Sequence, residues 1–445
     1  MQDNTTTLTT QLPEVVIPTR LDLIEEIQHT CANGINLHSL KCDSSAEVVR
    51  LSLVFKGGSS VQDKFFAAAS TLSMLSEGTE DYNAAEIAEK LDFYGIFYDN
   101  STDRDYCYIT LAALRKFLPQ ALTLLESMIL RPLFLDSEFK LYKGKKKQQL
   151  TIDRSKPSFM AREAFTSLLF GEEHPYGRFA DAELYDELSS VDLKKHYKEY
   201  LHADNCFAVA SGDLGSEDLE LIKSLLEKIP QQTTPSQHID YTIHENTTHT
   251  LYIERSEAVQ SCIRMGKTIV AKSHPDFIPL QLLCTVLGGY FGSRLVTNLR
   301  ERNGYTYGAY CGIVTLAEAS YMAIATDVDS SHTIAATQEI RNEIERLRTE
   351  EIPQEELDEA ISSITGELMR IIDGPFGIAD IAIENIQSGM PADYLNHFLA
   401  SVTKVTPSAL QEVAGRYFGT DSFKNATVGA PIESEPTETD SEEVE

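Results

Sequence analysis

The sequence predicts an α+β protein made of two homologous α/β-roll domains in tandem, each a mostly antiparallel sheet with helices packed on it. The chain has 445 residues, which is too long for one ordinary hydrophobic core. Helical and strand patterns alternate along both halves, with antiparallel hairpins between them. The order of the patterns in the first half returns in the second half, which indicates a duplicated unit.

In the first half, apolar and polar residues alternate over residues 49–56, which is the period of a half-buried strand. An Ala-rich helix follows, and Asn83 with Glu86 forms a capping box at the start of the next helix. The other elements predicted in this half are a hairpin at 96–100 and 106–112, helices at 118–130, 136–152 and 191–201, a strand at 205–211 and a helix from 216.

The second half follows the segment 230–235, PQQTTP, whose composition is typical of a linker. The elements predicted after it are strands between 250 and 270, a helix from 275, a helix–strand corner at 288–310, a strand at 321–327 and helices at 331–347 and 354–372. Asp136 aligns with Pro353, and Asp204 aligns with Asp421, each at an offset of 217 (353 − 136 and 421 − 204). Two separate elements at one offset indicate duplication rather than chance.

These patterns divide the chain into two domains with three connecting or terminal segments. The predicted parts are a flexible N-terminal segment (1–20), a first domain (21–229), a linker (230–246), a second domain (247–430) and a disordered tail (431–445). The last 14 residues hold seven acids and no base, which is typical of a solvated tail.

Charge and cysteine usage exclude several classes of function. The 38 basic and 68 acidic residues give a net charge of −30, which argues against nucleic acid and membranes as partners. Seven dispersed cysteines without a Cys-x-x-Cys pair are typical of a reducing compartment. The N-terminus does not resemble a signal peptide, and no apolar run reaches membrane-spanning length. We therefore expect a cytoplasmic protein.

The segment Gly288–Tyr310 is the candidate functional site. Arg300 closes a short helix, Gly304 breaks it, and Tyr307 lies on the strand that follows. A guanidinium and a phenol on one corner can both donate hydrogen bonds to a single peptide carbonyl oxygen. The alternative interpretation is a surface arginine beside a half-buried tyrosine.

Other motifs do not complete a catalytic site. The glycines at 288–292 do not have the spacing of a phosphate loop. The lysine-rich run Lys143–Lys147 is typical of a solvated helix face, and His174–Gly177 is typical of an ordered loop. The sequence contains neither a His-x-x-Glu-His zinc motif nor a Gly-x-Ser-x-Gly elbow.

From about residue 21 to residue 430, the chain resembles the pitrilysin/insulinase family of zinc peptidases, which includes the mitochondrial processing peptidases. The landmarks that carry the resemblance are Ser76–Thr79, His174–Gly177, Ser211–Asp213 and, above all, SRLVTNLRERNGYTYGAY at 293–310. The family fold is a duplicated α+β unit, as the repeat in this sequence also predicts.

The resemblance implies that the zinc site of this family is degenerate here. Active members carry His-x-x-Glu-His on the first helix, at the positions of Ala69, Leu72 and Ser73. Their third ligand, a glutamate, falls at Gln149. Alanine and leucine offer no ligand atom, and neutral serine and glutamine oxygens are poor zinc ligands. We therefore expect no metal, no cofactor and no zinc-peptidase activity in this chain alone.

The resemblance also implies a partner. Half-length bacterial members of the family pair like a clamshell, with zinc in one chain and the Arg/Tyr pair in the other. Arg300 and Tyr307 are intact, so the leading interpretation is the non-catalytic, substrate-binding subunit of a heterodimeric zinc endopeptidase acting on peptides or unfolded polypeptide. One alternative is an inert structural or peptide-binding homodimer that resembles core subunits of respiratory complexes. Another is an enzyme with a relocated metal site.

Overall fold

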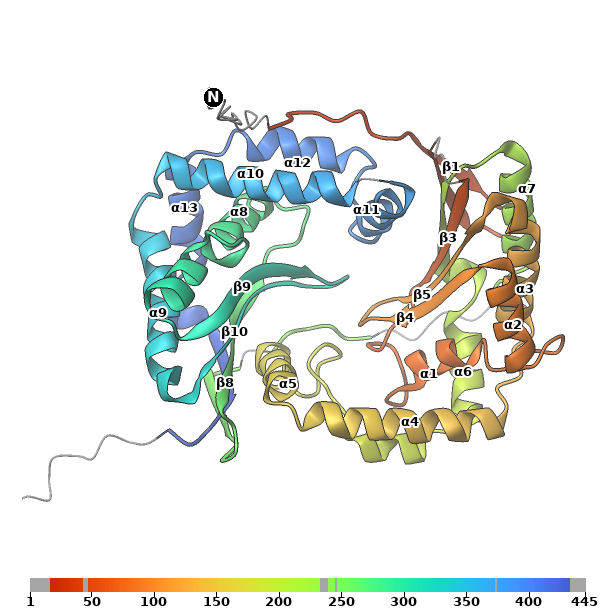
Figure 1. Ribbon diagram of the computed structural model, residues 1–445, viewed down its shortest axis with the longest axis horizontal. Helices are drawn as coiled ribbons and strands as arrows, with labels where there is room; N and C mark the ends of the chain where they lie inside the picture. The colour runs from red at the N-terminus through yellow and green to blue at the C-terminus, as the bar shows by residue number, and fades with distance from the viewer. Residues whose placement is uncertain (1–16, 43–46, 233–238, 245, 373, 433–445) are drawn as a thin grey trace, which may run out of the picture.

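The computed structural model describes residues 17–42, 47–232, 239–244, 246–372 and 374–432, which form two sheets with helices around them (Figure 1). Most of the predicted N-terminal segment, the middle of the predicted linker and residues 433–445 of the predicted tail lie outside the described residues. Within the described ranges, no helix combines the length and the apolar character needed to cross a bilayer.

The first sheet has six strands in the order β1-β2-β6-β3-β5-β4, and only β2 and β6 pair in parallel. Its strands are β1 (Glu26–Thr30), β2 (Asn36–Lys41), β3 (Val48–Phe55), β4 (Phe97–Thr102), β5 (Cys107–Leu114) and β6 (Cys206–Gly212). The helices and 3₁₀ turns of this half are α1 (Ala67–Met74), α2 (Ala84–Tyr94), η1 (Arg115–Phe117), α3 (Leu118–Leu130), η2 (Ala182–Glu187), α6 (Ser190–Tyr200), η3 (Ala203–Asn205) and α7 (Ser216–Leu226). The capping box of Asn83 and Glu86 at the start of α2 is confirmed.

The second sheet has five strands in the order β7-β11-β8-β10-β9, with β7 and β11 parallel. Its strands are β7 (Thr250–Glu254), β8 (Gln260–Ile269), β9 (Thr306–Thr315), β10 (Ser320–Asp329) and β11 (Lys424–Gly429). The helices and 3₁₀ turns of this half are α8 (Phe277–Gly288), η5 (Ser330–His332), α9 (Thr333–Thr349), α10 (Gln354–Ile371), α12 (Tyr394–Val402), α13 (Pro407–Tyr417) and η6 (Thr420–Ser422). The strand order matches β2-β6-β3-β5-β4 of the first sheet, so the predicted duplication is confirmed.

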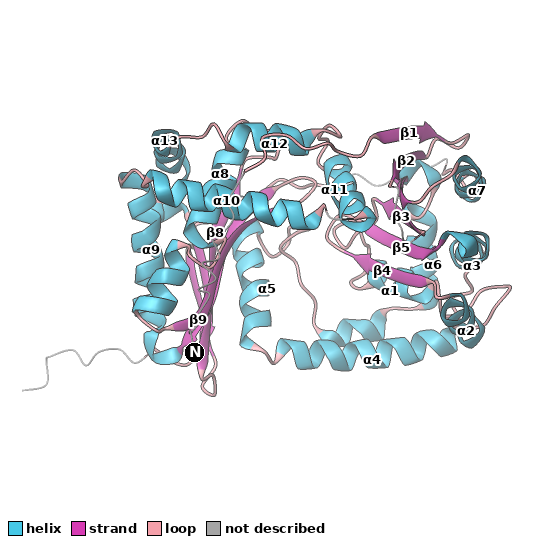
Figure 2. Ribbon diagram, turned by 45° about the horizontal axis from the view of Figure 1, so that its top comes forward, coloured by secondary structure: helices cyan, strands magenta, loops and turns pink. Residues whose placement is uncertain are grey.

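The two halves exchange one helix each. After α4 (Asp136–Arg154), the chain crosses to the second sheet, where α5 (Pro157–Phe170) packs on β8 and β11. After α10, α11 (Pro375–Gln387) packs on β2 and β6 of the first sheet. Figure 2 shows α11 beside this sheet. α4 and α10 begin 218 residues apart (354 − 136), within one residue of the predicted offset. The boundaries assigned to the two domains from the sequence stay a prediction.

The exchange explains why both faces of β3 are buried. Leu51 and Leu53 are fully buried in the core beneath the helices of the first half. Val54 points to the other face and packs in a cluster with Ala382 of α11. The sequence predicted that this second face is exposed, because alternation identifies the faces of a strand and not what covers each of them.

A buried carboxylate also connects the two halves. Asp105, in the turn between β4 and β5, accepts hydrogen bonds from the Tyr176 hydroxyl (2.6 Å) and from the backbone N–H of Ala317 (2.9 Å) in the turn between β9 and β10. His174 Nδ1 accepts a hydrogen bond from the Tyr176 N–H (3.0 Å), which confirms the predicted ordered loop. Burial raises the pKa of Asp105.

We predict that Asp105→Ala lowers the free energy of unfolding by about 1–3 kcal/mol, because the Tyr176 hydroxyl and the Ala317 N–H lose their acceptor. Denaturant titration measures the change. Asp99→Ala, at an exposed position on β4, is the matched control and should change stability little.

The effect of Asp105→Ala should also depend on pH. Because the folded state raises the pKa of this carboxyl, its stabilising effect is complete below the ordinary aspartate pKa of about 4 and falls as the pH rises through the raised pKa. The loss of stability should therefore be larger at pH 4 than at pH 8. An equal loss at both pH values would contradict the assigned environment.

Candidate functional site

The predicted helix–strand corner is present, with an unexpected helix geometry. Helical structure begins at Arg294 and becomes the π-helical turn η4 (Val296–Arg302). Gly304 then adopts a left-handed conformation (φ 66°) and the chain enters β9, as predicted. Short π-helical turns are rare and occur often at functional sites.

Neighbouring helices hold this corner in place. Arg294 donates two hydrogen bonds to Glu356 of α10, at 2.7 and 2.8 Å. The Asn298 amide donates to Glu339 and Glu343 of α9, at 2.8 Å each. Leu299 is fully buried in the core of the second half. A rigid helix presents side chains more precisely than a loop does, so the geometry of the corner suits a binding role.

Arg300 and Tyr307 project from this corner without hydrogen-bond partners among the described residues. The Tyr307 side chain is 91% exposed, which excludes the half-buried tyrosine of the alternative interpretation. Arg300 is exposed, and its guanidinium lies 4.7 Å from the ring centroid of Phe291. This cation–π contact orients the guanidinium and leaves its N–H groups free to donate.

The surface around Tyr307 is hollow and lies at a sheet edge. β9 is the last strand of the second sheet, so one side of its backbone has no partner strand in the described structure. Thr306, Tyr307 and Gly308 of β9 line a hollow of about 320 Å³ together with residues of β8 and β10, among them Arg264 and Asp327. An extended peptide can pair with a free strand edge of this kind.

The positions that correspond to the zinc motif and to the third zinc ligand lie in the first half and do not fit a metal. Ala69 is exposed on α1, Leu72 on the same helix is fully buried in the core, and Ser73 is partly exposed. Gln149 on α4 is exposed, and its amide donates to Asp153 at 3.0 Å. None of the four supplies the imidazole or carboxylate that zinc prefers. Within the described ranges, no three His, Cys, Asp or Glu side chains are grouped so that they could hold a metal ion.

The cysteines do not supply a nucleophile either. All seven are free thiols, and six of them are buried. Burial raises the pKa of both Cys107 and Cys262 to about 12, so these thiols stay protonated at neutral pH.

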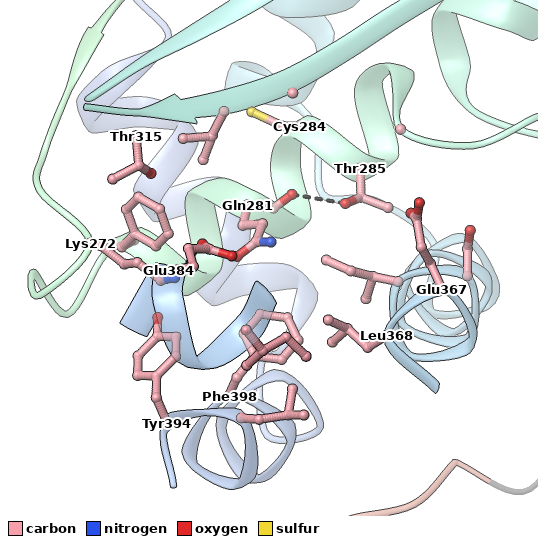
Figure 3. A pocket seen from close by; sticks show the side chains of 18 of the residues that line it. Lys272, Gln281, Cys284, Thr285, Thr315, Glu367, Leu368, Glu384, Tyr394 and Phe398 are labelled. Atoms are coloured by element: carbon pink, nitrogen blue, oxygen red, sulfur yellow. Dashed lines mark hydrogen bonds and ion pairs between the residues drawn. The ribbon is translucent and has the colours of Figure 1, made fainter. Parts of the chain in front are cut away.

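One cavity was not predicted from the sequence. It has a volume of about 340 Å³ and lies between α8, β9, α10, α11 and α12 (Figure 3). Its walls come from residues 272 to 398, and no local pattern links side chains so far apart in the chain. Lys272 and Tyr394 are single polar residues far apart in the sequence, so only the tertiary structure shows that they line the same cavity.

Two sequence models of one peptidase family match the chain. "Insulinase (Peptidase family M16)" matches residues 39–174, and "Peptidase M16 inactive domain" matches residues 187–364. The chain belongs to the M16 insulinase family of peptidases. It is of the inactive type, in agreement with the absence of ligand side chains at Ala69, Leu72, Ser73 and Gln149.

Relatives and solved structures agree with this assignment. The non-peptidase homolog YmxG of Helicobacter pylori is 24% identical over 324 residues, which are 71% of this chain and 73% of that protein. The uncharacterized zinc protease YmxG of Bacillus subtilis is 19% identical over 390 residues, 87% of this chain and 91% of that protein. A crystal structure of a peptidase M16 inactive domain from Pseudomonas fluorescens has a TM-score of 0.85 at 21% identity and covers 93% of this chain and 100% of its own. The predicted tandem α+β fold is thereby confirmed.

We predict that the purified chain retains far less than one zinc ion per molecule after dialysis, because the four positions supply no imidazole or carboxylate. Elemental analysis measures the content. The triple variant Ala69→His, Ser73→His and Gln149→Glu restores three ligands and should gain zinc. Stoichiometric zinc in the unmodified chain would contradict the expectation and favour a relocated metal site.

Proposed function

We propose that this chain is the non-catalytic, substrate-binding subunit of a heterodimeric zinc endopeptidase acting on peptides or unfolded polypeptide. The observation that carries the proposal is the contrast between the two halves of the chain. Arg300 and Tyr307 are exposed on a rigid corner and have no hydrogen-bond partner among the described residues, whereas Ala69, Leu72, Ser73 and Gln149 supply no imidazole or carboxylate for zinc.

In this proposal, Arg300 and Tyr307 act on a substrate whose zinc is held by the other chain. Both side chains donate hydrogen bonds to the oxygen of the scissile carbonyl, which becomes negatively charged as water attacks it. The guanidinium adds positive charge, which strengthens its hydrogen bond to that oxygen. Each donor of this kind contributes about 3–4 kcal/mol of transition-state stabilisation.

The free edge of β9 gives the same subunit a way to hold peptide. Backbone groups on a free edge recognise an extended chain whatever its side chains are, which suits a broad range of substrates. Tyr307 belongs to this strand, so a peptide paired with it would pass next to the hydroxyl. Binding and transition-state stabilisation would then depend on one element.

We predict that Arg300→Ala and Tyr307→Phe, each mixed with an M16 subunit that carries His-x-x-Glu-His, lower the kcat of peptide cleavage by about 10²–10³-fold. The reason is the loss of one oxyanion donor in each case. Cleavage of a quenched fluorescent peptide by the reconstituted pair measures the rate.

Arg302→Ala is the matched control, because Arg302 is also an exposed arginine of η4. It should leave cleavage nearly unchanged. If Arg300→Ala and Tyr307→Phe cleave as well as Arg302→Ala does, the assigned role is wrong. A stable homodimer that binds no zinc-containing subunit would instead favour the structural homodimer.

A further inference from the structure

The cavity between α8, β9, α10, α11 and α12 has one end rich in unused hydrogen-bond donors. Figure 3 shows Lys272 and Glu384 together at this end, with Tyr394 close to Lys272. The Lys272 ammonium lies 5.0 Å from the centroid of that ring and 2.5 Å from a carboxylate oxygen of Glu384. Since an ammonium has three donors, two of those on Lys272 remain available.

Three further polar groups of the cavity lack partners within the described structure. The Tyr394 hydroxyl is buried and makes no hydrogen bond. Asn385 is only 4% exposed, and its side-chain amide makes no hydrogen bond to another described residue. The Gln281 amide also makes no hydrogen bond to a described residue, but Gln281 is only partly buried, so water can satisfy it. A buried hydroxyl without a partner, such as that of Tyr394, is uncommon in native proteins and needs a ligand, an ion or water to satisfy it.

The rest of the cavity combines polar side chains, among them Thr285, Ser363 and Glu367, with one apolar wall. Phe277, Ile364, Leu368 and Phe398 line it, and Figure 3 shows Leu368 and Phe398 together on one wall. A ligand with an apolar body against this wall and a polar end at Lys272 matches both features. Burial of that body from water favours binding.

The charge of the polar end selects the ligand class. Lys272 has a side chain that is only 9% exposed, and its one charged partner, Glu384, is 60% exposed. An amine would be repelled by Lys272, whereas a carboxylate offers several lone pairs to donors. Because Glu384 reaches Lys272 from solvent, it can return to water at little cost when another carboxylate arrives.

We propose that this cavity binds an apolar monocarboxylate, with the carboxylate on Lys272 and Tyr394 and the apolar body against Phe277 and Phe398. Glu384 holds the place of that carboxylate in the free protein and is displaced by the ligand. The site is separate from Arg300 and Tyr307, so the inference does not depend on the proposed peptidase role. The same chemistry occurs in a small free acid and at the C-terminus of a peptide that ends in an apolar residue.

Isothermal titration calorimetry of the full chain with 3-phenylpropionate and octanoate tests the proposal, with their methyl esters as neutral controls. The acids should bind and the esters should bind at least about tenfold more weakly, which is the effect of losing a charge-assisted hydrogen bond. Lys272→Gln should weaken the acids by a similar factor, and Tyr394→Phe by about two- to tenfold.

Glu384→Gln provides the distinctive result, because it should tighten binding of the acids by up to about fivefold through loss of the competing carboxylate. Glu367→Gln removes an equal charge from the same cavity without touching Lys272 and should have a clearly smaller effect. Equal effects of the two variants, or weaker binding by Glu384→Gln, would overturn the displacement of Glu384. Circular dichroism confirms that each variant is folded.

Peptides that end in phenylalanine, with either a free or an amidated C-terminus, show whether the bound carboxylate comes from a peptide C-terminus or from a small free acid. Preference for the free C-terminus would identify peptide ends as ligands, whereas binding of the small acids alone would identify a free metabolite-like acid. Either outcome supports a carboxylate site. Absence of binding by all the acids and free peptides, or equal binding of acids and esters, would overturn it.

Discussion

The exchange of α5 and α11 between the two sheets is the constraint on which the rest of this structure depends. Each sheet has helices of its own half on one face and a helix from the other half on the opposite face. Val54 of the first sheet packs with Ala382 of α11, and Arg50 forms an ion pair with Asp380 of the same helix at 2.6 Å. Separation of the halves would expose these apolar faces to water, so burial of the faces fixes the halves relative to one another.

The two halves of this shared fold differ in the side chains at their candidate functional positions. The first half retains the helix and the fold of a metallopeptidase unit, yet Leu72 has become part of its hydrophobic core. In the second half, hydrogen bonds of Arg294 and Asn298 hold the corner in place, and the exposed Arg300 and Tyr307 have no hydrogen-bond partner within the described chain. The first half therefore contributes packing at these positions, and the second half presents hydrogen-bond donors. This difference is what the proposed pairing with a zinc-containing subunit predicts.

Much of the fold could be predicted because it follows from local periodicity. The strand period around Leu51 and the capping box at Asn83 depend on neighbours in sequence, and both were found where expected. The helix exchange could not be predicted in this way, because periodicity does not identify the partner of a face. The same reason explains why Val54 was expected to be exposed.

The candidate site divides in a similar manner. The corner with Arg300 and Tyr307 lies within eight residues of sequence, so its position could be inferred from Gly304 and from the family resemblance. The π-helical geometry of this corner could not be inferred, because the sequence analysis found no pattern that distinguishes it from an ordinary helix. The cavity around Lys272 joins side chains from five separate elements, and only the tertiary structure brings them together.

The central claim is that this chain completes an active site whose zinc lies in another protein. The most direct measurement is peptide cleavage by this chain alone, by an M16 subunit with an intact zinc motif alone, and by their mixture, with light scattering to measure the mass of the complex. The account predicts a one-to-one complex that cleaves peptide while neither chain does so alone. Full cleavage by the zinc subunit alone, unchanged when this chain is added, would contradict it.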